Sequence, residues 1–110
     1  TTPGPGELQA ALMRALRDPS LVVAYWLPEA GRYVDPGGHS VSLPDENAGR
    51  SVTSVERDGR RIAALIHDPA LKDDPQLVES VGAAAALALE NEQLQAELRA
   101  RLAELAASRA

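Results

Sequence analysis

The stretch that decides the fold is residues 75–110, which read PQLVESVGAAAALALENEQLQAELRARLAELAASRA. Apart from Pro75 and Gly82 it contains no proline or glycine, and it is rich in Ala, Leu, Glu and Arg, which are strong helix formers. As one helix these 36 residues would be about 54 Å long, whereas a domain of this size is only about 30 Å across. We therefore expect the helix to extend beyond the domain that precedes it, so that another surface must cover its apolar side.

Leucines recur along this helix at the spacing of a coiled coil. Leu87, Asn91, Leu94 and Leu98 are separated by steps of 4, 3 and 4, which is a heptad pattern. Two more leucines follow after a second step of four, a stutter that locally unwinds a supercoil. An Asn on such a seam fixes the pairing of a parallel, in-register dimer. The predicted homodimer interface comprises Leu87, Asn91, Leu94, Leu98, Leu102 and Leu105.

The alternative is that the helix packs only on its own domain. That suits its first part, with Leu77, Val78 and the alanines of 83–86, but leaves the leucines beyond Asn91 with nothing to cover them. The predicted organisation is therefore a helix-plus-sheet portion over residues 1–74 and a C-terminal helix over 75–110. This helix is expected to pack on the sheet to about residue 90 and then to continue as a coiled coil.

Two fully apolar runs predict central strands ahead of this helix. Residues 21–27 and 62–66 are apolar at every position, so each should be covered on both faces of a sheet. Asp58-Gly59 separates two extended runs, 51–57 and 60–67, and is a strong signal for a hairpin turn. Shorter strands are expected over residues 32–34 and 39–43, and an amphipathic helix, which Asp18-Pro19 ends, over 6–17.

These elements define the fold class. The connections are too short for parallel crossovers, so the sheet should be antiparallel. We expect an α+β fold in which about five strands form one sheet, with the N-terminal helix and the long C-terminal helix packed on one face. The other face should hold a small cavity or be closed by a partner.

Composition narrows the functional classes. The chain of 110 residues suits a single domain, and its net charge of −5 argues against nucleic acid or anionic membrane as the main partner. The absence of cysteine excludes disulfides, a thiolate nucleophile and zinc–thiolate sites. No apolar run approaches the ~20 residues of a membrane span, and no signal peptide is evident. The chain begins without Met and looks like a piece of a larger protein.

Few residues suggest chemistry. Tyr25 and Trp26 should point to opposite faces of their strand, and the one that does not join the core could line a ligand pocket with Tyr33. The predicted ligand-binding residues are accordingly Trp26 and Tyr33, with simple core packing as the alternative.

His39 and His67 lack the spacing of a metal site, so no metal ligands are predicted. No nucleophile elbow, paired-carboxylate motif or phosphate-binding glycine loop is present, so no catalytic residues are predicted. Arg57, Arg60 and Arg61 surround the hairpin tip, where solvation is favoured over anion binding.

Five segments of the chain form a distinctive combination: DPSL at 18–21, AYWLP at 24–28, GRYVD at 31–35, VERDGRRIAALIHDPAL at 55–71 and LALENE at 87–92. Together they resemble the sensor region of actinobacterial two-component sensor histidine kinases, in which a degenerate GAF-like domain precedes the dimerisation and phosphotransfer helices. The resemblance covers nearly the whole chain and implies a GAF/PAS-like sheet. It departs from the family in the loop 44–49, too short for the ligand-capping insert of a full GAF domain. The family's phosphoacceptor motif is absent, and His67-Asp68 stands at a strand end before Pro69, so that role is not carried over.

The resemblance implies a non-catalytic sensory and dimerisation domain on the cytoplasmic side, and leaves open whether the parent protein is membrane-anchored. The phosphotransfer and ATP-binding domains of such kinases follow the point where this chain stops, so the fragment needs no cofactor and ATP belongs to the parent kinase. The implied partners are a second copy of the chain and the downstream kinase domains. Two alternatives stay open: a small-molecule-binding module with an apolar pocket, and a purely structural spacer.

Overall fold

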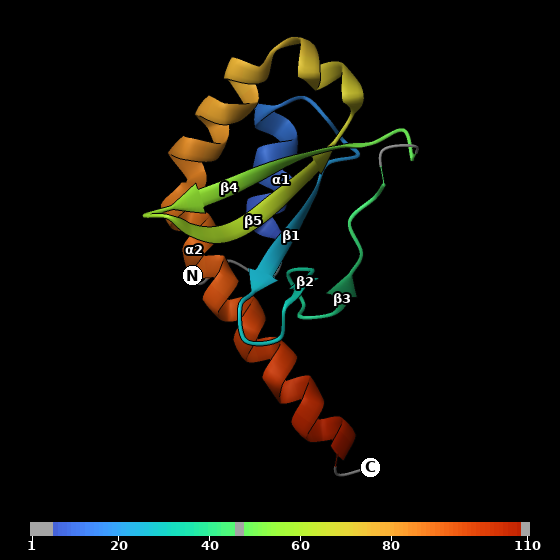
Figure 1. The fold of residues 1–110 in the computed structure, drawn as a ribbon, viewed down its shortest axis with the longest axis vertical. Coiled ribbons are helices and arrows are strands. Elements are labelled where there is room, and N and C mark those ends of the chain that lie inside the picture. Colours follow the sequence, from blue (N-terminus) through green and yellow to red (C-terminus); the bar gives the residue numbers. More distant parts are fainter. Residues whose placement is uncertain (1–5, 46–47, 109–110) are drawn as a thin grey trace.

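The computed structural model describes residues 6–45 and 48–108, and its fold is α+β (Figure 1). An N-terminal helix precedes five strands and a short 3-10 helix, and a long C-terminal helix follows them. The elements are α1 (Glu7–Ala15), β1 (Val22–Leu27), β2 (Arg32–Val34), β3 (Ser40–Val41), β4 (Ser51–Arg57), β5 (Arg60–His67), η1 (Pro69–Asp73) and α2 (Pro75–Ser108).

The strands form one antiparallel sheet in the order β3-β2-β1-β5-β4. The strands that contain the two fully apolar runs, β1 and β5, are interior strands and pair with each other from Val22–Ile66 to Tyr25–Ala63. This placement confirms that both are central strands, and residues 23–25 and 62–66 are buried. The edges are β3, which is only two residues long, and β4, which has seven residues.

The β4–β5 hairpin turns at Asp58 and Gly59, whose φ angles are 55° and 75°. Positive φ at both central positions is the type I′ geometry that the Asp-Gly pair favours. Further along, the register shifts from Glu56–Arg61 to Val55–Ala63, so β5 contains Ile62 as one extra residue. Such a bulge turns successive side chains toward the same face.

Both helices pack on one face of the sheet, over a core of aliphatic residues and Tyr25. From the sheet, the core includes Val23 and Leu65, both completely buried. From α1 it takes Leu12, and the side chain of Gln9 accepts a hydrogen bond from the Val23 N–H at 2.9 Å. The helices therefore lie where the sequence analysis expected them.

The opposite face of the sheet carries a second, smaller apolar cluster. Ala24 and Ala64 are completely buried there and Ile66 is 6% exposed. Val22, Tyr33 and Val41 are partly buried and pack around them. Side chains from β1, β2 and β3 thus cover the small central residues of this face.

Two details differ from the sequence expectation. The segment 69–73 forms the 3-10 helix η1, in which the Asp68 carboxylate accepts from the Ala70 N–H at 2.8 Å. More important, α2 does not leave its own domain near residue 90. It stays packed through Gln93, Ala96 and Ala100, which are 8%, 0% and 3% exposed, and only its last turns project past the sheet (Figure 1). Small side chains make this possible, because they let the helix approach the strands and turns closely.

Candidate functional site

The long helix α2 has two different sides. Its inward stripe repeats at steps of three and four residues and is largely built from small side chains. This stripe consists of Val78, Gly82, Ala86, Leu89, Gln93, Ala96 and Ala100, all buried.

The outward stripe is built from leucines. These side chains lie on roughly the opposite side of the helix, by the rotation of 100° per residue that 3.6 residues per turn implies. Asn91 is exposed between them. The exposed fractions are 56% for Leu87, 59% for Leu94, 53% for Leu98, 56% for Leu102 and 56% for Leu105. All six residues of the predicted dimer interface thus share one exposed side of α2, while their pairing with a second copy stays a prediction.

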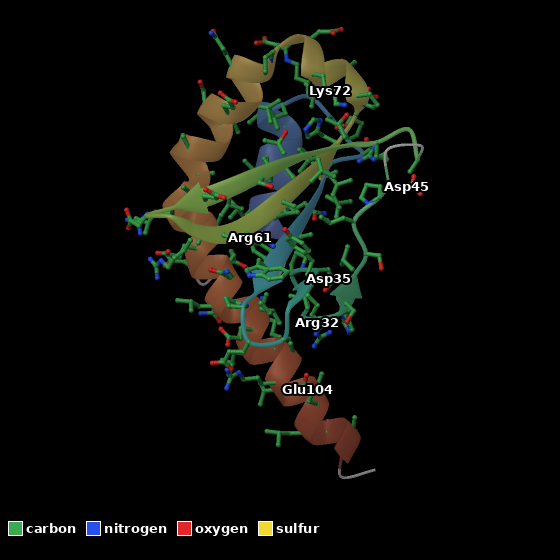
Figure 2. The ribbon with its side chains drawn as sticks, viewed as in Figure 1. Arg32, Asp35, Asp45, Arg61, Lys72 and Glu104 are labelled. Atoms are coloured by element: carbon green, nitrogen blue, oxygen red, sulfur yellow. The ribbon has the colours of Figure 1, made fainter. Side chains whose placement is uncertain are left out.

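Glutamates at seven-residue intervals flank this leucine stripe, and each forms an ion pair with an arginine of the same chain. Glu90 is the most enclosed, with its side chain 17% exposed, and it accepts from Arg57 at 2.9 Å and Arg60 at 3.0 Å. Surface pairs contribute only about 0–1 kcal/mol each to stability. Two of these glutamates, Glu90 and Glu104, are connected in this way to arginines of the sheet strands. The other pairs are Glu97 with Arg101 at 2.8 Å and Glu104 with Arg32 at 3.3 Å, and Figure 2 labels both members of the second pair.

A tight turn after β2 contacts α2 at the point where the packing of this helix on the domain ends. The Asp35 carboxylate accepts from the N–H groups of Gly37 and His39, which shapes the turn. At Gly38, where φ is +92°, an added Cβ would lie 2.6 Å from the backbone N of Ala100. The turn therefore touches the helix backbone directly, and only glycine fits there.

Two side chains of α2 hold the helix against the strands and this turn. The Gln93 amide donates to the Trp26 carbonyl at 2.7 Å and to the Arg61 carbonyl at 3.3 Å, so it bridges β1 and β5 just beyond their last paired residues. Arg99 donates to the Pro36 carbonyl at 2.9 Å. A buried amide with two specific acceptors fixes how far α2 can slide along the sheet, because any shift would leave those groups unpaired.

The aromatic pair singled out in the sequence is in contact. The rings of Trp26 and Tyr33 are 5.0 Å apart between centroids, and the Arg61 guanidinium lies 4.6 Å from the centre of the Trp26 ring. Tyr25 points to the other face and is buried in the helix-side core, where burial, followed by the nearby Glu92 carboxylate, raises the pKa of its hydroxyl.

Trp26 borders an open surface groove of about 370 Å³ that lies between the sheet and α2. Leu94 of the outward stripe lines the same groove, whereas Tyr33 does not. The lining residues are Trp26, Pro28, Arg60, Arg61, Ile62, Gln93, Leu94 and Glu97. The aromatic pair therefore borders a groove through one member only, and its role in ligand binding stays a prediction.

The histidines have structural surroundings. His67 is 1% exposed, and its ring nitrogens lie 2.8 Å from the Thr53 hydroxyl and 3.0 Å from the Asp68 carbonyl. Since a carbonyl only accepts, Nδ1 is the donor and Nε2 is free to accept from the hydroxyl. His39 is exposed beside Asp35. Within residues 6–45 and 48–108, no three His, Asp or Glu side chains gather as a metal site would require.

A carboxylate network joins α1, the sheet and η1. Asp18 is 5% exposed and accepts from the Ser20 N–H, the Ser20 hydroxyl at 2.6 Å and the Asp68 N–H at 2.8 Å. Burial alone would raise the pKa of Asp18. The hydrogen bonds from Ser20 and Asp68, helped by the charge of Arg50, outweigh burial and hold it below the ordinary value.

Sequence reasoning missed the residues that connect α2 to the sheet. Nothing in the sequence around Gly38 shows that a helix about 60 positions later touches it. Asp18 was interpreted only as the end of a helix. Gln93 did leave a signal, because it continues the inward spacing from Leu89 to Ala96 and is polar where an apolar residue would be expected.

Comparisons of the chain with protein-family models, with curated proteins and with solved structures gave no match. None of the helices among the described residues combines the length and the apolar character that crossing a bilayer requires.

Proposed function

We propose that this chain is a GAF-like, non-catalytic sensory and dimerisation domain of a two-component sensor histidine kinase, acting on the cytoplasmic side of the cell. Its C-terminal helix would relay a signal to a phosphotransfer and kinase core that follows in the same polypeptide. ATP and the phosphoacceptor histidine would belong to that core. The observation that carries the proposal is the two-sided α2, with one side packed on the sheet and leucines along the other.

A second copy of the chain is the partner that this pattern favours. The leucines follow heptad spacing around Asn91, which suits a parallel coiled-coil pair. An antiparallel pair would place the glutamate flanks of the two helices against each other, whereas a parallel pair places each flank against Ala88 and Gln95 of the other copy. The ion pairs from Arg57, Arg60 and Arg32 already neutralise much of that flank.

The contacts on the inward side supply a route for the signal. Gly38, Gln93 and Arg99 connect the helix to the turn after β2 and to the carbonyls of β1 and β5. A change in the sheet that moved these groups would shift the angle or register of the paired helices, and so bias the kinase between two states. The stutter between Leu98 and Leu102 is a place where such a register could yield.

Sedimentation of the intact chain over a range of concentrations tests the dimer. Leu94→Glu with Leu98→Glu should abolish dimerisation without unfolding the domain, because both side chains are more than half exposed. Ala103→Glu is the matched control, since Ala103 is exposed on the same helix but faces away from the leucine stripe. If wild type is monomeric throughout, or if the double variant dimerises as the control does, the proposed interface is wrong.

Trp26 favours a second candidate, a small-molecule module, because it borders a groove of about 370 Å³, within the usual range of ligand sites. A thermal-shift screen with Trp26 fluorescence as the second readout tests it. A ligand at 100 times its Kd should add about 2.7 kcal/mol to stability, and Trp26→Leu should remove the shift. The leading proposal expects no large hit, because the loop 44–49 is short, and it expects no ATP turnover by this chain.

A further inference from the structure

The strand β4 is an edge strand of the sheet. β5 pairs along one side of it, and in the described part of the chain no strand pairs along the other. Alternate residues of such a strand direct their N–H and C=O groups outward. Natural edges are usually protected by charge, proline or shortness, but residues 51–55 read SVTSV, with neither charge nor proline. The other edge, β3, is only two residues long.

A groove follows this edge, with β4 as one wall and α2 as the other. Its central part, of about 160 Å³, lies between residues 53–56 of the strand and Val78, Glu79, Gly82 and Ala83 of the helix. Towards the start of the strand, Thr53 and Glu79 also border a hollow of about 110 Å³, which Lys72 lines. Lys72 in turn borders a hollow of about 410 Å³ beside Ser51. Figure 1 shows η1 and the first turns of α2 arching around this edge.

On the helix side, the middle of the groove is lined by two small residues, Gly82 and Ala83. A Cβ at Gly82 would meet only the Val55 Cγ2 atom, at 3.4 Å, which is an ordinary contact. The packing of the domain thus does not require this glycine, although glycine inside a helix costs about 1 kcal/mol relative to alanine. Its effect is to leave room beside β4 for the side chains of another segment.

The end of the groove at Ser51 is polar, and two cationic side chains, Arg50 and Lys72, line it. Ser51 is 4% exposed, and its hydroxyl is the buried side-chain oxygen without a hydrogen-bond partner among the described residues. Arg50 donates to three neutral oxygens, on Ser20 and Ile66. Lys72 forms no ion pair with the described residues, and Asp45 is the one acidic residue lining this hollow (Figure 2).

We propose that this groove binds an extended peptide segment, which adds to β4 as a sixth strand and places an acidic side chain beside Arg50 and Lys72. Backbone groups along a free edge are satisfied best by another strand, and the pockets beside it select the side chains. Because the groove has a strand on one side and a helix on the other, it fits a single extended segment. The small residues of its helix wall favour aliphatic side chains in the middle of that segment.

Selection of random seven-residue peptides on the intact chain tests the proposal. Enriched peptides, labelled with fluorescein and titrated by fluorescence anisotropy, should contain aliphatic residues followed or preceded by an acidic one. Ala83→Leu should weaken their binding about tenfold or more by filling the groove. Ala103→Leu, at an exposed alanine of the same helix that neither lines the groove nor belongs to the leucine stripe, should leave binding unchanged.

Charge provides a second readout that separates this site from other surfaces. Lys72→Glu should weaken the acidic peptides, whereas Arg14→Glu, which reverses an exposed charge on α1, should not. Selection that enriches no peptide, or peptides that bind Ala83→Leu as tightly as wild type, overturns the proposal. The leucine stripe of α2 takes no part in this test, so the peptide site and the dimer can fail independently.

Discussion

The two sides of α2 reverse the usual distribution of side chains in a globular protein. Four of the inward positions are glycine or alanine, Gly82, Ala86, Ala96 and Ala100, and all are buried. The outward stripe holds five leucines that are each more than half exposed. A helix that only covered its own sheet would place the leucines inward, because burying one is worth about 1.5–3 kcal/mol.

In the proposed dimer, contact with the sheet and contact with the partner would therefore lie on separate sides of this helix. Small inward residues bring the helix backbone close to the sheet and to the turn at Gly38. A displacement of the sheet or of this turn would therefore move the helix. Large outward residues supply the apolar area that association requires. The predictions below test whether the inward side contributes only to packing on the sheet and the outward side only to association.

The largest expected effect is at the closest contact of the inward side. Gly38→Ala puts a Cβ at 2.6 Å from the Ala100 backbone and forces a non-glycine residue to φ +92°. Backbone strain of this kind costs about 1–3 kcal/mol, and overpacking adds a similar amount. Urea unfolding should therefore show a loss of about 2–6 kcal/mol.

Gly31→Ala separates the two causes. Gly31 also has positive φ, +63°, but an added Cβ there meets nothing within 4 Å. This control should lose only the strain contribution. If both variants lose the same stability, the turn does not press on α2 and the proposed link between sheet and helix fails.

Removing one leucine from each side compares the two stripes directly. Leu89 is completely buried, so Leu89→Ala should cost about 2–5 kcal/mol at any protein concentration. Leu98 is 53% exposed, so Leu98→Ala in the monomer should change stability by less than about 0.5 kcal/mol. Wild type should become more stable as concentration rises and the dimer forms, and Leu98→Ala should not.

Unfolding curves at a low and a high protein concentration measure this difference. A large loss for Leu98→Ala in the dilute monomer would show that the outward stripe covers part of its own domain. The two sides would then not be separate.

A smaller, pH-dependent effect on stability is expected at Asp18. Asp18 accepts the Asp68 N–H and so positions η1, which leads into α2. Asp18→Asn should cost about 1–3 kcal/mol at neutral pH, because an amide cannot accept all of these bonds. The pKa of Asp18 is lowered in the folded state, although burial opposes the hydrogen bonds that lower it. Its contribution is therefore complete above the unfolded pKa and is lost as pH falls through the folded pKa.

The measurement is the stability of wild type and Asp18→Asn from neutral pH down to acid. The gap between them should be constant above about pH 5 and should close below about pH 4. Ser20→Ala, which removes one of the donors, should give a smaller gap of the same shape. If the difference in stability between wild type and Asp18→Asn does not change with pH, the charge of the Asp18 carboxylate is not what positions η1.

The fold class was predictable because its signals are local. The Asp58-Gly59 pair, the apolar runs of β1 and β5 and the uninterrupted helix-forming sequence of α2 each determine an element from nearby residues. The side of α2 that carries the leucines was predictable for the same reason, since helix geometry alone puts them together.

The extent of packing was not predictable, because it depends on distant contacts. The expectation that α2 leaves the sheet near residue 90 rested on the size of the domain, which left no surface to cover the helix beyond Asn91. Ala100 packs instead against the turn at Gly38, Ala96 is buried in the core, and Gln93 uses hydrogen bonds to two strands. No sequence spacing links those positions. The groove along β4 escaped notice for a related reason, because it exists only where a strand edge meets a helix wall.

The smallest expected effect is a gain in stability, and it also tests why the inward side contains a glycine. Gly82→Ala adds a methyl group at 3.4 Å from Val55, an ordinary contact, and removes the flexibility of a glycine inside a helix. Urea unfolding should show about 0.5–1 kcal/mol of added stability. The same variant should bind selected peptides more weakly, because the methyl group narrows the groove beside β4. A loss of stability would mean that α2 needs glycine to approach β4, and the free space at this position would then have no bearing on a peptide.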